Sequence, residues 1–371
     1  MASGLQRQTP VSFSVVHACT DYSQPADAPV VKRARHEADP STDARIIIFG
    51  GRNPNGKSAL MFMMRLNTPN HQWVELESMP TDRQYGVAAA LGPDRKLVLR
   101  ALRQVPALTH FPPGIVPLMA AFLGPEFVLL AGGIESGQAS LDCPTVRYSL
   151  ENGSWDTDLS PSPPRRYWAT ATVIADQMLV CGGSDAATNL ALASCEAFDP
   201  TTNCWTSLPP MSTPRTGHCA AEWQGRVFVF GGRSGDSRTA SSCECYDPTL
   251  RRWSPLTPLN RARNHAAAVA MAGSGILVLG GCDVEMLQTA ELYDPTTHSW
   301  STFPWILPKP ISNFSAHYTD SKLYIAGGYI GGVLGGCTAE VWVLDLALES
   351  PAWAPLPPLP TPLFGTASVL V

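Results

Sequence analysis

Three side chains in the last third of the sequence have the types and spacing of a metal-binding run. They are Glu291, Asp294 and His298, and carboxylates and imidazoles are common metal ligands in proteins. The carboxylate spacing recurs twice earlier in the chain, with another residue in place of the histidine: Glu196, Asp199 and Asn203, then Glu244, Asp247 and Arg251. Because the carboxylates repeat in register and the histidine does not, we interpret the run as structural. We expect no bound metal and no cofactor.

The ten cysteines are a second set of residues that could bind a metal. No Cys-x-x-Cys pair occurs, and Cys243 and Cys245 lie two residues apart on one expected strand. Small thiols of this kind are typical of buried positions in a reducing compartment. We therefore predict buried thiols rather than a zinc site.

Arginine, aromatic, histidine and amide side chains recur just before or just after short apolar runs. Arginine and aromatic residues contribute much of the binding free energy at protein interfaces. We predict that the following residues bind a partner: Arg52, Arg166, Trp168, Arg215, His218, Arg233, Arg261, His265, Asn313 and Tyr329. An alternative for Arg215 and Arg261 is hydrogen bonding to neighbouring backbone carbonyls. The sequence shows no phosphate-binding loop and no nucleophile elbow, so we predict no catalytic residue.

The elements that must position these residues repeat along the chain. A Gly-Gly pair closes a short apolar run at residues 50–51, 132–133, 182–183, 231–232, 280–281 and 327–328. A tryptophan follows each pair: Trp73, Trp155, Trp205, Trp253, Trp300 and Trp353. A period of about 50 residues indicates a repeat architecture, and such folds usually bind through one face.

One period, residues 215–256, has the pattern of four strands. His218–Ala221 is a run of small residues, and Arg226–Phe230 is a continuous apolar run that predicts burial on both faces. Cys243–Asp247 alternates as a half-buried strand does, and Trp253 lies on the fourth strand. Four antiparallel strands of this kind form one blade of a β-propeller.

The repeat resembles the kelch repeat. The apolar run ending in Gly-Gly, the spaced tryptophan and the Tyr-Asp-Pro turns at residues 246–248 and 293–295 all match its pattern. The resemblance covers residues 45–371 and implies an all-β, kelch-type β-propeller. It also implies a scaffold, cytoskeletal-adaptor or ubiquitin-ligase-adaptor role, among which the sequence does not choose.

The number of blades is open at one place. Between the Gly-Gly pairs at residues 50–51 and 132–133, residues 85–91 resemble a first strand, Lys96–Arg100 a second strand, and Ile115–Leu123 the first strand of the next blade. We predict seven blades with the second incomplete. The alternative is six blades with a long insertion.

The two ends of the chain compete to complete the first blade. Residues 365–371 resemble the first strand of a blade, and the repeat that begins at Arg45 lacks such a strand just upstream. We predict that this C-terminal strand closes the ring, with Val11–Ala18 as the rival. Residues 1–44 are polar and lie outside the repeat, so we expect a disordered tail before a propeller at 45–371.

Charge and hydropathy narrow the classes of partner. The net charge is −5, which disfavours non-specific binding to nucleic acid. The apolar span at Ile115–Ala131 is broken by Pro117, Pro125 and Glu126, so we expect no membrane segment. The first residues lack the pattern of a secretory signal, while Lys32–Arg35 matches a minimal basic import signal. We expect a cytoplasmic protein, with the nucleus as an alternative location.

These observations favour a binding module over an enzyme. In a ring of four-stranded blades, the loops before the first strands and those after the second strands emerge on one side. We expect a monomeric, non-enzymatic module that binds a protein or peptide through that side. The alternative, implied by some kelch relatives, is a small-molecule enzyme such as a sugar-acid epimerase that uses the ring centre.

Overall fold

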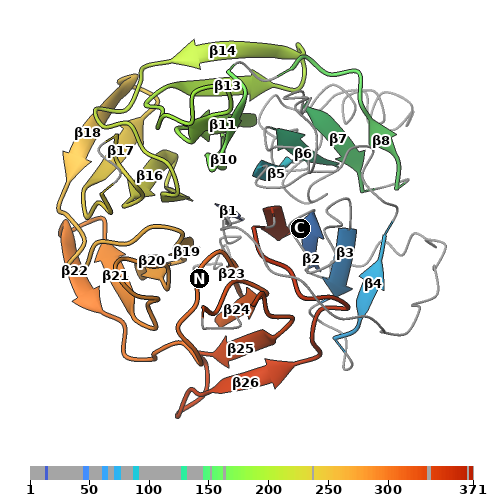
Figure 1. Ribbon diagram of the computed structural model, residues 1–371, viewed down its shortest axis with the longest axis vertical. Coiled ribbons are helices and arrows are strands. Elements are labelled where there is room, and N and C mark those ends of the chain that lie inside the picture. The colour runs from blue at the N-terminus through green and yellow to red at the C-terminus, as the bar shows by residue number, and fades with distance from the viewer. Residues whose placement is uncertain are drawn as a thin grey trace, which may run out of the picture.

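The computed structural model describes residues 13–15, 45–49, 61–65, 71–76, 87–91, 127–131, 145–150, 153–161, 164–235, 238–331, 336–365 and 367–370. Within these ranges the chain forms strands and loops and no helix. The strands form a β-propeller whose blades are arranged in a ring (Figure 1), and the described residues make six blades.

Five blades are four-stranded antiparallel sheets, in which the strands follow one another from the axis outward. The first two are β5 (Val87–Leu91), β6 (Phe127–Ala131), β7 (Val146–Ser149) and β8 (Trp155–Asp156), then β10 (Thr170–Ile174), β11 (Gln177–Cys181), β13 (Cys195–Asp199) and β14 (Cys204–Leu208). The next is β15 (Cys219–Trp223), β16 (Arg226–Phe230), β17 (Cys243–Asp247) and β18 (Arg252–Leu256). The last two are β19 (Ala267–Met271), β20 (Gly275–Leu279), β21 (Ala290–Asp294) and β22 (Ser299–Thr302), then β23 (Ser315–Thr319), β24 (Lys322–Ala326), β25 (Val341–Asp345) and β26 (Trp353–Leu356).

The remaining blade is built from both ends of the chain. Its sheet has the order β1 (Phe13–Val15), β27 (Ala367–Leu370), β2 (Arg45–Phe49), β3 (Met61–Arg65) and β4 (Trp73–Glu75). β27 pairs antiparallel with β2, with Ile46 opposite Leu370, and β1 pairs with the inner edge of β27. The C-terminal strand and its rival segment therefore both belong to this sheet. The expectation that residues 1–44 lie outside the propeller does not hold for Phe13–Val15.

The prediction of seven blades is not confirmed. β5 pairs with β6 in full register, from Val87 opposite Ala131 to Leu91 opposite Phe127. The described part of the expected first strand, Val87–Leu91, is thus the inner strand of the blade that contains Phe127–Ala131, rather than part of a separate blade. The segments Lys96–Arg100 and Ile115–Leu123 lie outside the described residues. The six sheets agree with the alternative of six blades and a long insertion.

The core lies between neighbouring blades. The continuous apolar runs on the second strands are buried, and one cluster joins Phe228 and Phe230 of β16 to Ile276, Val278 and Tyr293 of the next blade. Burying side chains of this size contributes roughly 1.5–3 kcal/mol each. Small residues on the innermost strands, such as those of β19, allow six strands to approach one another around the axis (Figure 1).

Four of the repeated tryptophans, Trp73, Trp205, Trp253 and Trp300, link their blade to the segment that leaves the blade before it. The indole Nε1–H of Trp253 donates to the carbonyl of Pro209 at 2.9 Å, and Trp300 donates to Thr257 at 2.9 Å. Trp73 donates to the carbonyl of Pro357 at 3.2 Å, which joins the blade of β2 to the chain that leaves the blade of β26. The tryptophan period therefore reflects contacts between successive blades.

Replacing Gly231 with Ala should destabilise the protein far more than replacing Gly225. Both glycines have positive φ, +62° and +77°, so an L side chain costs about 1–2 kcal/mol at either position. A Cβ at Gly231 would lie 2.2 Å from the carbonyl oxygen of Arg263, whereas nothing lies within 4 Å of one at Gly225. Urea unfolding should show a loss at least about 2 kcal/mol larger for Gly231→Ala. Equal losses of unfolding free energy for the two variants would contradict the close approach of the Gly231 and Arg263 backbones.

Candidate functional site

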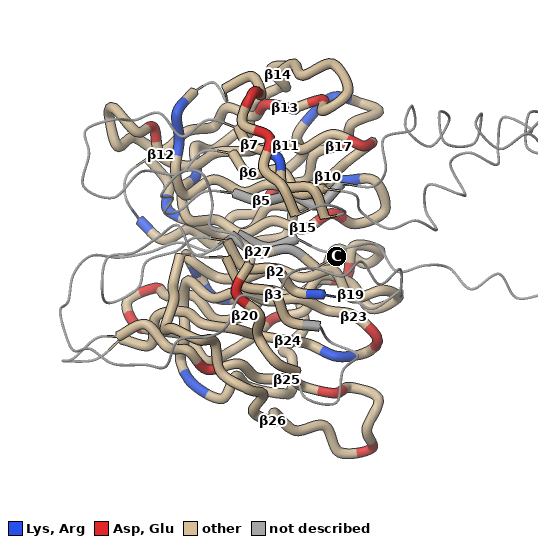
Figure 2. The backbone as a smooth tube through the Cα atoms, turned by 90° about the vertical axis from the view of Figure 1, so that its right-hand side faces the viewer, with Lys and Arg blue, Asp and Glu red and all other residues tan. Residues whose placement is uncertain are grey.

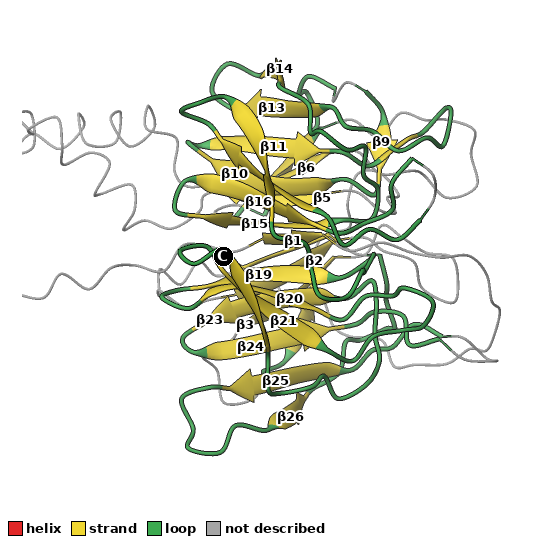
Figure 3. Cartoon of the chain, turned by 90° about the vertical axis from the view of Figure 1, so that its left-hand side faces the viewer, coloured by secondary structure: helices red, strands yellow, loops and turns green. Residues whose placement is uncertain are grey.

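The loops before the first strands and after the second strands pair with one another on one side of the ring. β9 (Arg166–Tyr167) pairs with β12 (Ser184–Asp185), and isolated bridges join Thr216 to Arg233, Asn264 to Cys282 and Ser312 to Tyr329. We call this side the loop face, and it comprises segments 164–168, 184–191, 215–217, 233–235, 238–240, 263–265, 282–286, 312–314 and 329–331. Figure 3 shows β9 and the long loops on this side, and Figure 2 shows both basic and acidic residues there.

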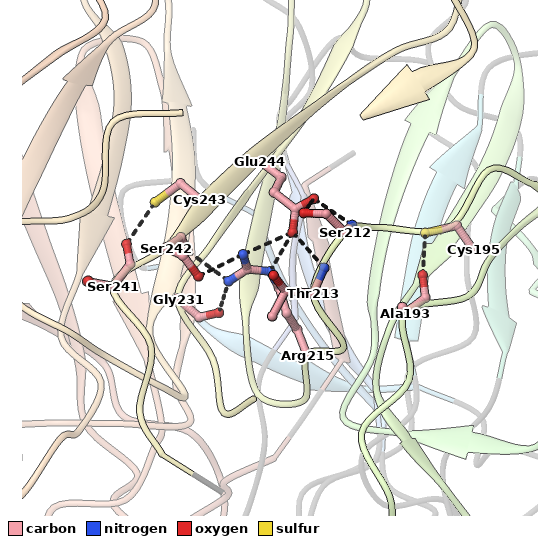
Figure 4. Close-up of polar contacts among 10 residues, drawn as sticks. All are labelled: Ala193, Cys195, Ser212, Thr213, Arg215, Gly231, Ser241, Ser242, Cys243 and Glu244. Atoms are coloured by element: carbon pink, nitrogen blue, oxygen red, sulfur yellow. Dashed lines mark hydrogen bonds and ion pairs between the residues drawn. The ribbon is translucent and has the colours of Figure 1, made fainter. Parts of the chain in front are cut away.

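A buried arginine holds each of three such loops against its own blade. Arg215 is 0% exposed, and its guanidinium donates to the carbonyls of Gly231 and Ser242 at 2.9 and 2.8 Å (Figure 4). It also pairs with the carboxylate of Glu244 at 3.0 Å. That carboxylate accepts further hydrogen bonds from the backbone N–H and hydroxyl of Ser212. The loop before the first strand, the Gly-Gly turn and the third strand are thus joined at one side chain.

The same arrangement recurs in the blades on either side. Arg166 donates to the carbonyl of Gly182 and pairs with Glu196, and Arg263 donates to Gly280 and pairs with Glu291 at 2.6 Å. Burial lowers the pKa of Arg166 and raises that of Glu196, although each charge opposes the shift of the other. A buried pair of this kind stabilises a structure only when further hydrogen bonds satisfy both groups, as the glycine carbonyls do here.

The metal-like run is explained by this arrangement. Its glutamates are the partners of the buried arginines, and its aspartates begin the turn between the third and fourth strands. Asp247 Oδ1 accepts the backbone N–H groups of Thr249 and Leu250 at 2.9 and 3.0 Å, and these bonds lower its pKa. His298 shares a hydrogen bond with the Tyr293 hydroxyl. Within the described ranges no group of three His, Cys, Asp or Glu residues could hold a metal ion.

Several residues predicted to bind a partner have structural roles. Arg166 and Arg215 are buried in the ion pairs above, so their side chains cannot touch a partner, and the carbonyl-bonding alternative holds for Arg215. His218 is 1% exposed, and its Nε2 bonds to the Thr170 hydroxyl of the neighbouring blade at 2.9 Å. Asn313 is also buried. Burial was missed for these residues because their partners are distant in the sequence.

The other predicted residues are accessible where they are described. Arg233 is exposed, and Arg261 is exposed and pairs with Glu285 at 2.8 Å. Trp168, His265 and Tyr329 are half-buried. Arg52 lies outside the described residues.

One residue from each of five successive loops lies at the end of the central axis, and backbone hydrogen bonds join these five residues in an arc. Each has positive φ, and we call the set the mouth ring: Trp168, Gly217, His265, Asn313 and Gly365. Their backbones are linked in order, because the N–H of Gly217 donates to Trp168, that of His265 to Gly217, that of Asn313 to His265 and that of Gly365 to Asn313. These hydrogen bonds therefore hold the Cα positions of the mouth-ring residues, from which their side chains extend.

Aromatic side chains meet at the mouth ring. The rings of Trp168 and His265 lie 5.4 Å apart in an edge-to-face arrangement, across the space that Gly217 leaves without a side chain. Phe364 packs against Tyr167, Trp168 and Tyr329, so contacts cross from one blade to another. Sequence reasoning missed Phe364, although Phe364-Gly365 stands before a first strand as Tyr167-Trp168 does.

Comparison with known proteins identifies the repeat. The family model "KLHDC2/KLHL20/DRC7 Kelch-repeats domain" matches residues 119–328, and two models described as "Kelch motif" match residues 33–80 and 310–360. The chain belongs to the kelch-repeat family. The resemblance inferred from the Gly-Gly pairs, the Tyr-Asp-Pro turns and the tryptophans is thereby confirmed.

Several curated proteins are similar to part of this chain. Spermatocyte protein spe-26 of Caenorhabditis elegans is 29% identical over 60% of this chain and 40% of its own length. Kelch-like protein 25 of Mus musculus is 35% identical over 43% of this chain and 27% of its own, and the kelch-like protein terF of Aspergillus terreus is 26% identical over 55% and 51%. The chain thus spans about half or less of the curated relatives it matches. The solved structure of YjhT covers 80% of this chain and 91% of its own with a TM-score of 0.62, and its 12% identity bears on the fold alone.

The described cysteines of this kelch protein are free thiols. Burial raises the pKa of Cys219 and Cys245 to about 12 and that of Cys243 to about 11. Cys204 is exposed on the outer strand β14. The described part of the chain holds no helix long and apolar enough to span a membrane.

The native protein should react with iodoacetamide at Cys204 and spare Cys219 and Cys245. Thiolate is the reactive form, and burial both blocks access to these two thiols and disfavours their ionisation. Peptide mass spectrometry after labelling at pH 8 checks this, with urea-unfolded protein as the control in which all three react. Labelling of Cys219 as fast as Cys204 in the native state would contradict the burial.

Separate substitutions of Arg215 and Arg233 should distinguish an arginine that stabilises the fold from one that is only exposed on the surface. Arg215→Ala leaves the Glu244 carboxylate buried without its cation and should cost about 3–5 kcal/mol of unfolding free energy. Arg233→Ala changes an exposed side chain and should stay within about 0.5 kcal/mol of the wild type. Chemical denaturation measures both. Similar losses of unfolding free energy for the two variants would contradict a buried, structural role for Arg215 and an exposed position for Arg233.

Proposed function

We propose that this kelch protein is a non-enzymatic interaction module that binds a protein or peptide partner at the mouth ring. The observation that carries the proposal is the presence of Trp168 and His265 at φ of +59° and +54°. Gly217 and Gly365 hold the equivalent positions in other blades. Positive φ is uncommon for residues other than glycine, and for bulky ones it is an outlier that costs of order 1–3 kcal/mol.

Such strain clusters at functional sites and persists only where the surrounding structure holds the backbone in that conformation. Here glycine would satisfy the backbone, as it does at positions 217 and 365. The bulky residues at 168 and 265 therefore serve contacts of their side chains. Aromatic side chains are also the types that contribute most at protein interfaces.

The residues around the mouth ring suit a protein partner whose surface has both apolar and charged groups. Two apolar side chains project from loop tips on the same face, Leu190 at 64% exposed and Val284 at 97%. Charges of both signs occur on this face: Arg233 and Asp185 belong to its loops, and Arg261 pairs with Glu285 at 2.8 Å. Apolar contacts beside charges of both signs fit a peptide or protein surface better than a uniformly charged polymer such as nucleic acid.

Membership of the kelch family supports a scaffold or adaptor role, of the ubiquitin-ligase or cytoskeletal kind. The alternative of a small-molecule enzyme requires a cavity at the ring centre. In this structure β1 lies at that centre, paired with β27. No observation among the described residues favours the enzyme.

Trp168→Gly and His265→Gly should weaken partner binding strongly and leave the fold intact. Relief of backbone strain offsets part of the lost packing, so the unfolding free energy should change by less than about 2 kcal/mol. Loss of aromatic anchors should weaken capture at least about tenfold. Affinity purification with quantitative mass spectrometry compares the proteins retained by each variant and by the wild type.

The matched control is Arg251→Ala. Arg251 also has positive φ, +50°, but it lies in the turn between β17 and β18, at the opposite end of the strands. This variant should retain the same proteins as the wild type. If both glycine variants retain the same proteins as the wild type, the mouth ring is not the binding site.

A further inference from the structure

The segment Phe13–Val15 lies in the centre of the propeller. β1 pairs with the inner edge of β27, and Figure 1 shows it within the ring, close to the axis. Its Cα atoms also lie within 8 Å of those of the innermost strands β5, β10, β15, β19 and β23. In the described sheets of the other blades, the innermost strand has no such additional neighbour.

The pairing has a defined register and direction. Phe13 lies opposite Val369, Ser14 opposite Ser368 and Val15 opposite Ala367. β1 is antiparallel to β27, and its C-terminal end lies next to Ala367, two residues from Gly365 of the mouth ring. A strand in this position fills the central channel from its far end toward the loop face.

The sequence of the segment suits an extended strand. Val11, Phe13 and Val15 alternate with Ser12 and Ser14, which is the period-two pattern of a strand. The unpaired edge of a strand is a template for any chain with free N–H and C=O groups, and backbone hydrogen bonds supply much of the affinity in such additions. Only three residues pair here, so the contact is short enough to exchange.

We propose that the inner edge of β27 is a strand-acceptor site for extended peptides with alternating apolar and small polar residues. The N-terminal segment Phe13–Val15 fills the site in cis, and a peptide of the same pattern fills it in trans when that segment is removed. Because the cis strand is tethered, its effective concentration is in the millimolar range and it outcompetes a dilute peptide. The N-terminal segment thereby keeps the channel closed.

The direct test uses a synthetic peptide and a truncated protein. The probe is a fluorescein-labelled peptide with the sequence of residues 10–17, and the variant lacks residues 1–16. Fluorescence anisotropy should show binding to the truncated protein and at least tenfold weaker binding to the intact chain. Equal binding to both proteins, or no binding to the truncated protein, would overturn the proposal.

A matched peptide separates backbone pairing from apolar attraction. Replacing both Phe13 and Ser14 with Pro in the peptide removes two adjacent backbone N–H groups, one of which must point toward β27 because successive groups alternate in direction. This peptide should not bind. A second control that keeps both backbone N–H groups, the peptide with Phe13→Ala, should bind more weakly without losing binding.

A second measurement keeps the proposal testable if the truncated protein does not fold. The same two Pro substitutions are made in the full-length chain, with Leu5→Pro and Gln6→Pro as the control pair outside β1. Hydrogen exchange of those amides in Ala367–Leu370 that point toward β1 should speed up at least tenfold with the first pair and stay unchanged with the second, while the amides that point toward β2 stay protected. Unchanged exchange with the first pair would show that β1 does not protect β27. Neither experiment involves the partner of the mouth ring, so the two proposals fail independently.

Discussion

A buried guanidinium paired with a buried carboxylate is the interaction on which the loop face depends. In Arg215 and Glu244 it joins the loop before the first strand, the Gly-Gly turn after the second and the middle of the third. Each group alone would be costly to bury, since a charge in a protein interior requires both a partner and hydrogen bonds. The glycine carbonyls supply those hydrogen bonds because the backbone turns sharply there at positive φ. The blade thus fixes its loops through one polar contact that excludes water.

The buried arginines also set the positions of the mouth-ring residues. Trp168, Gly217 and His265 each lie two residues after a buried arginine, so anchoring the arginine fixes where the ring residue begins. The backbone hydrogen bonds from one ring residue to the next then couple neighbouring blades. Side chains can vary at these positions without disturbing the blades, which is how one repeat presents glycine in one copy and tryptophan in another. In the proposed function, binding specificity and stability are carried by different residues of the same short loop.

Features within one repeat could be predicted from the sequence, and features between distant segments could not. The Gly-Gly pairs, the Asp-Pro turns and the tryptophans are local patterns, and they indicated the family and the four-stranded blade. The pairing of Val87–Leu91 with Phe127–Ala131 crosses a long insertion, and loop-closure entropy rises so slowly with length that nothing local marks the partner. The ion pairs of Arg166 and Arg215 with their buried glutamates were missed for the same reason. Their glutamates lie 30 and 29 residues later, and that repeated Arg-to-Glu spacing was the signal that could have found them.

The central claim is that the partner of this kelch protein contacts the mouth ring and not the outer strands. Hydrogen exchange with mass spectrometry, on the protein alone and in complex with a partner isolated by affinity capture, tests it most directly. Slower exchange is predicted in peptides that contain Trp168, His265 and Tyr329, with no change in β14, β18 or β22. Protection confined to the outer strands or to the turns at the opposite end, with the mouth ring unchanged, would contradict the claim.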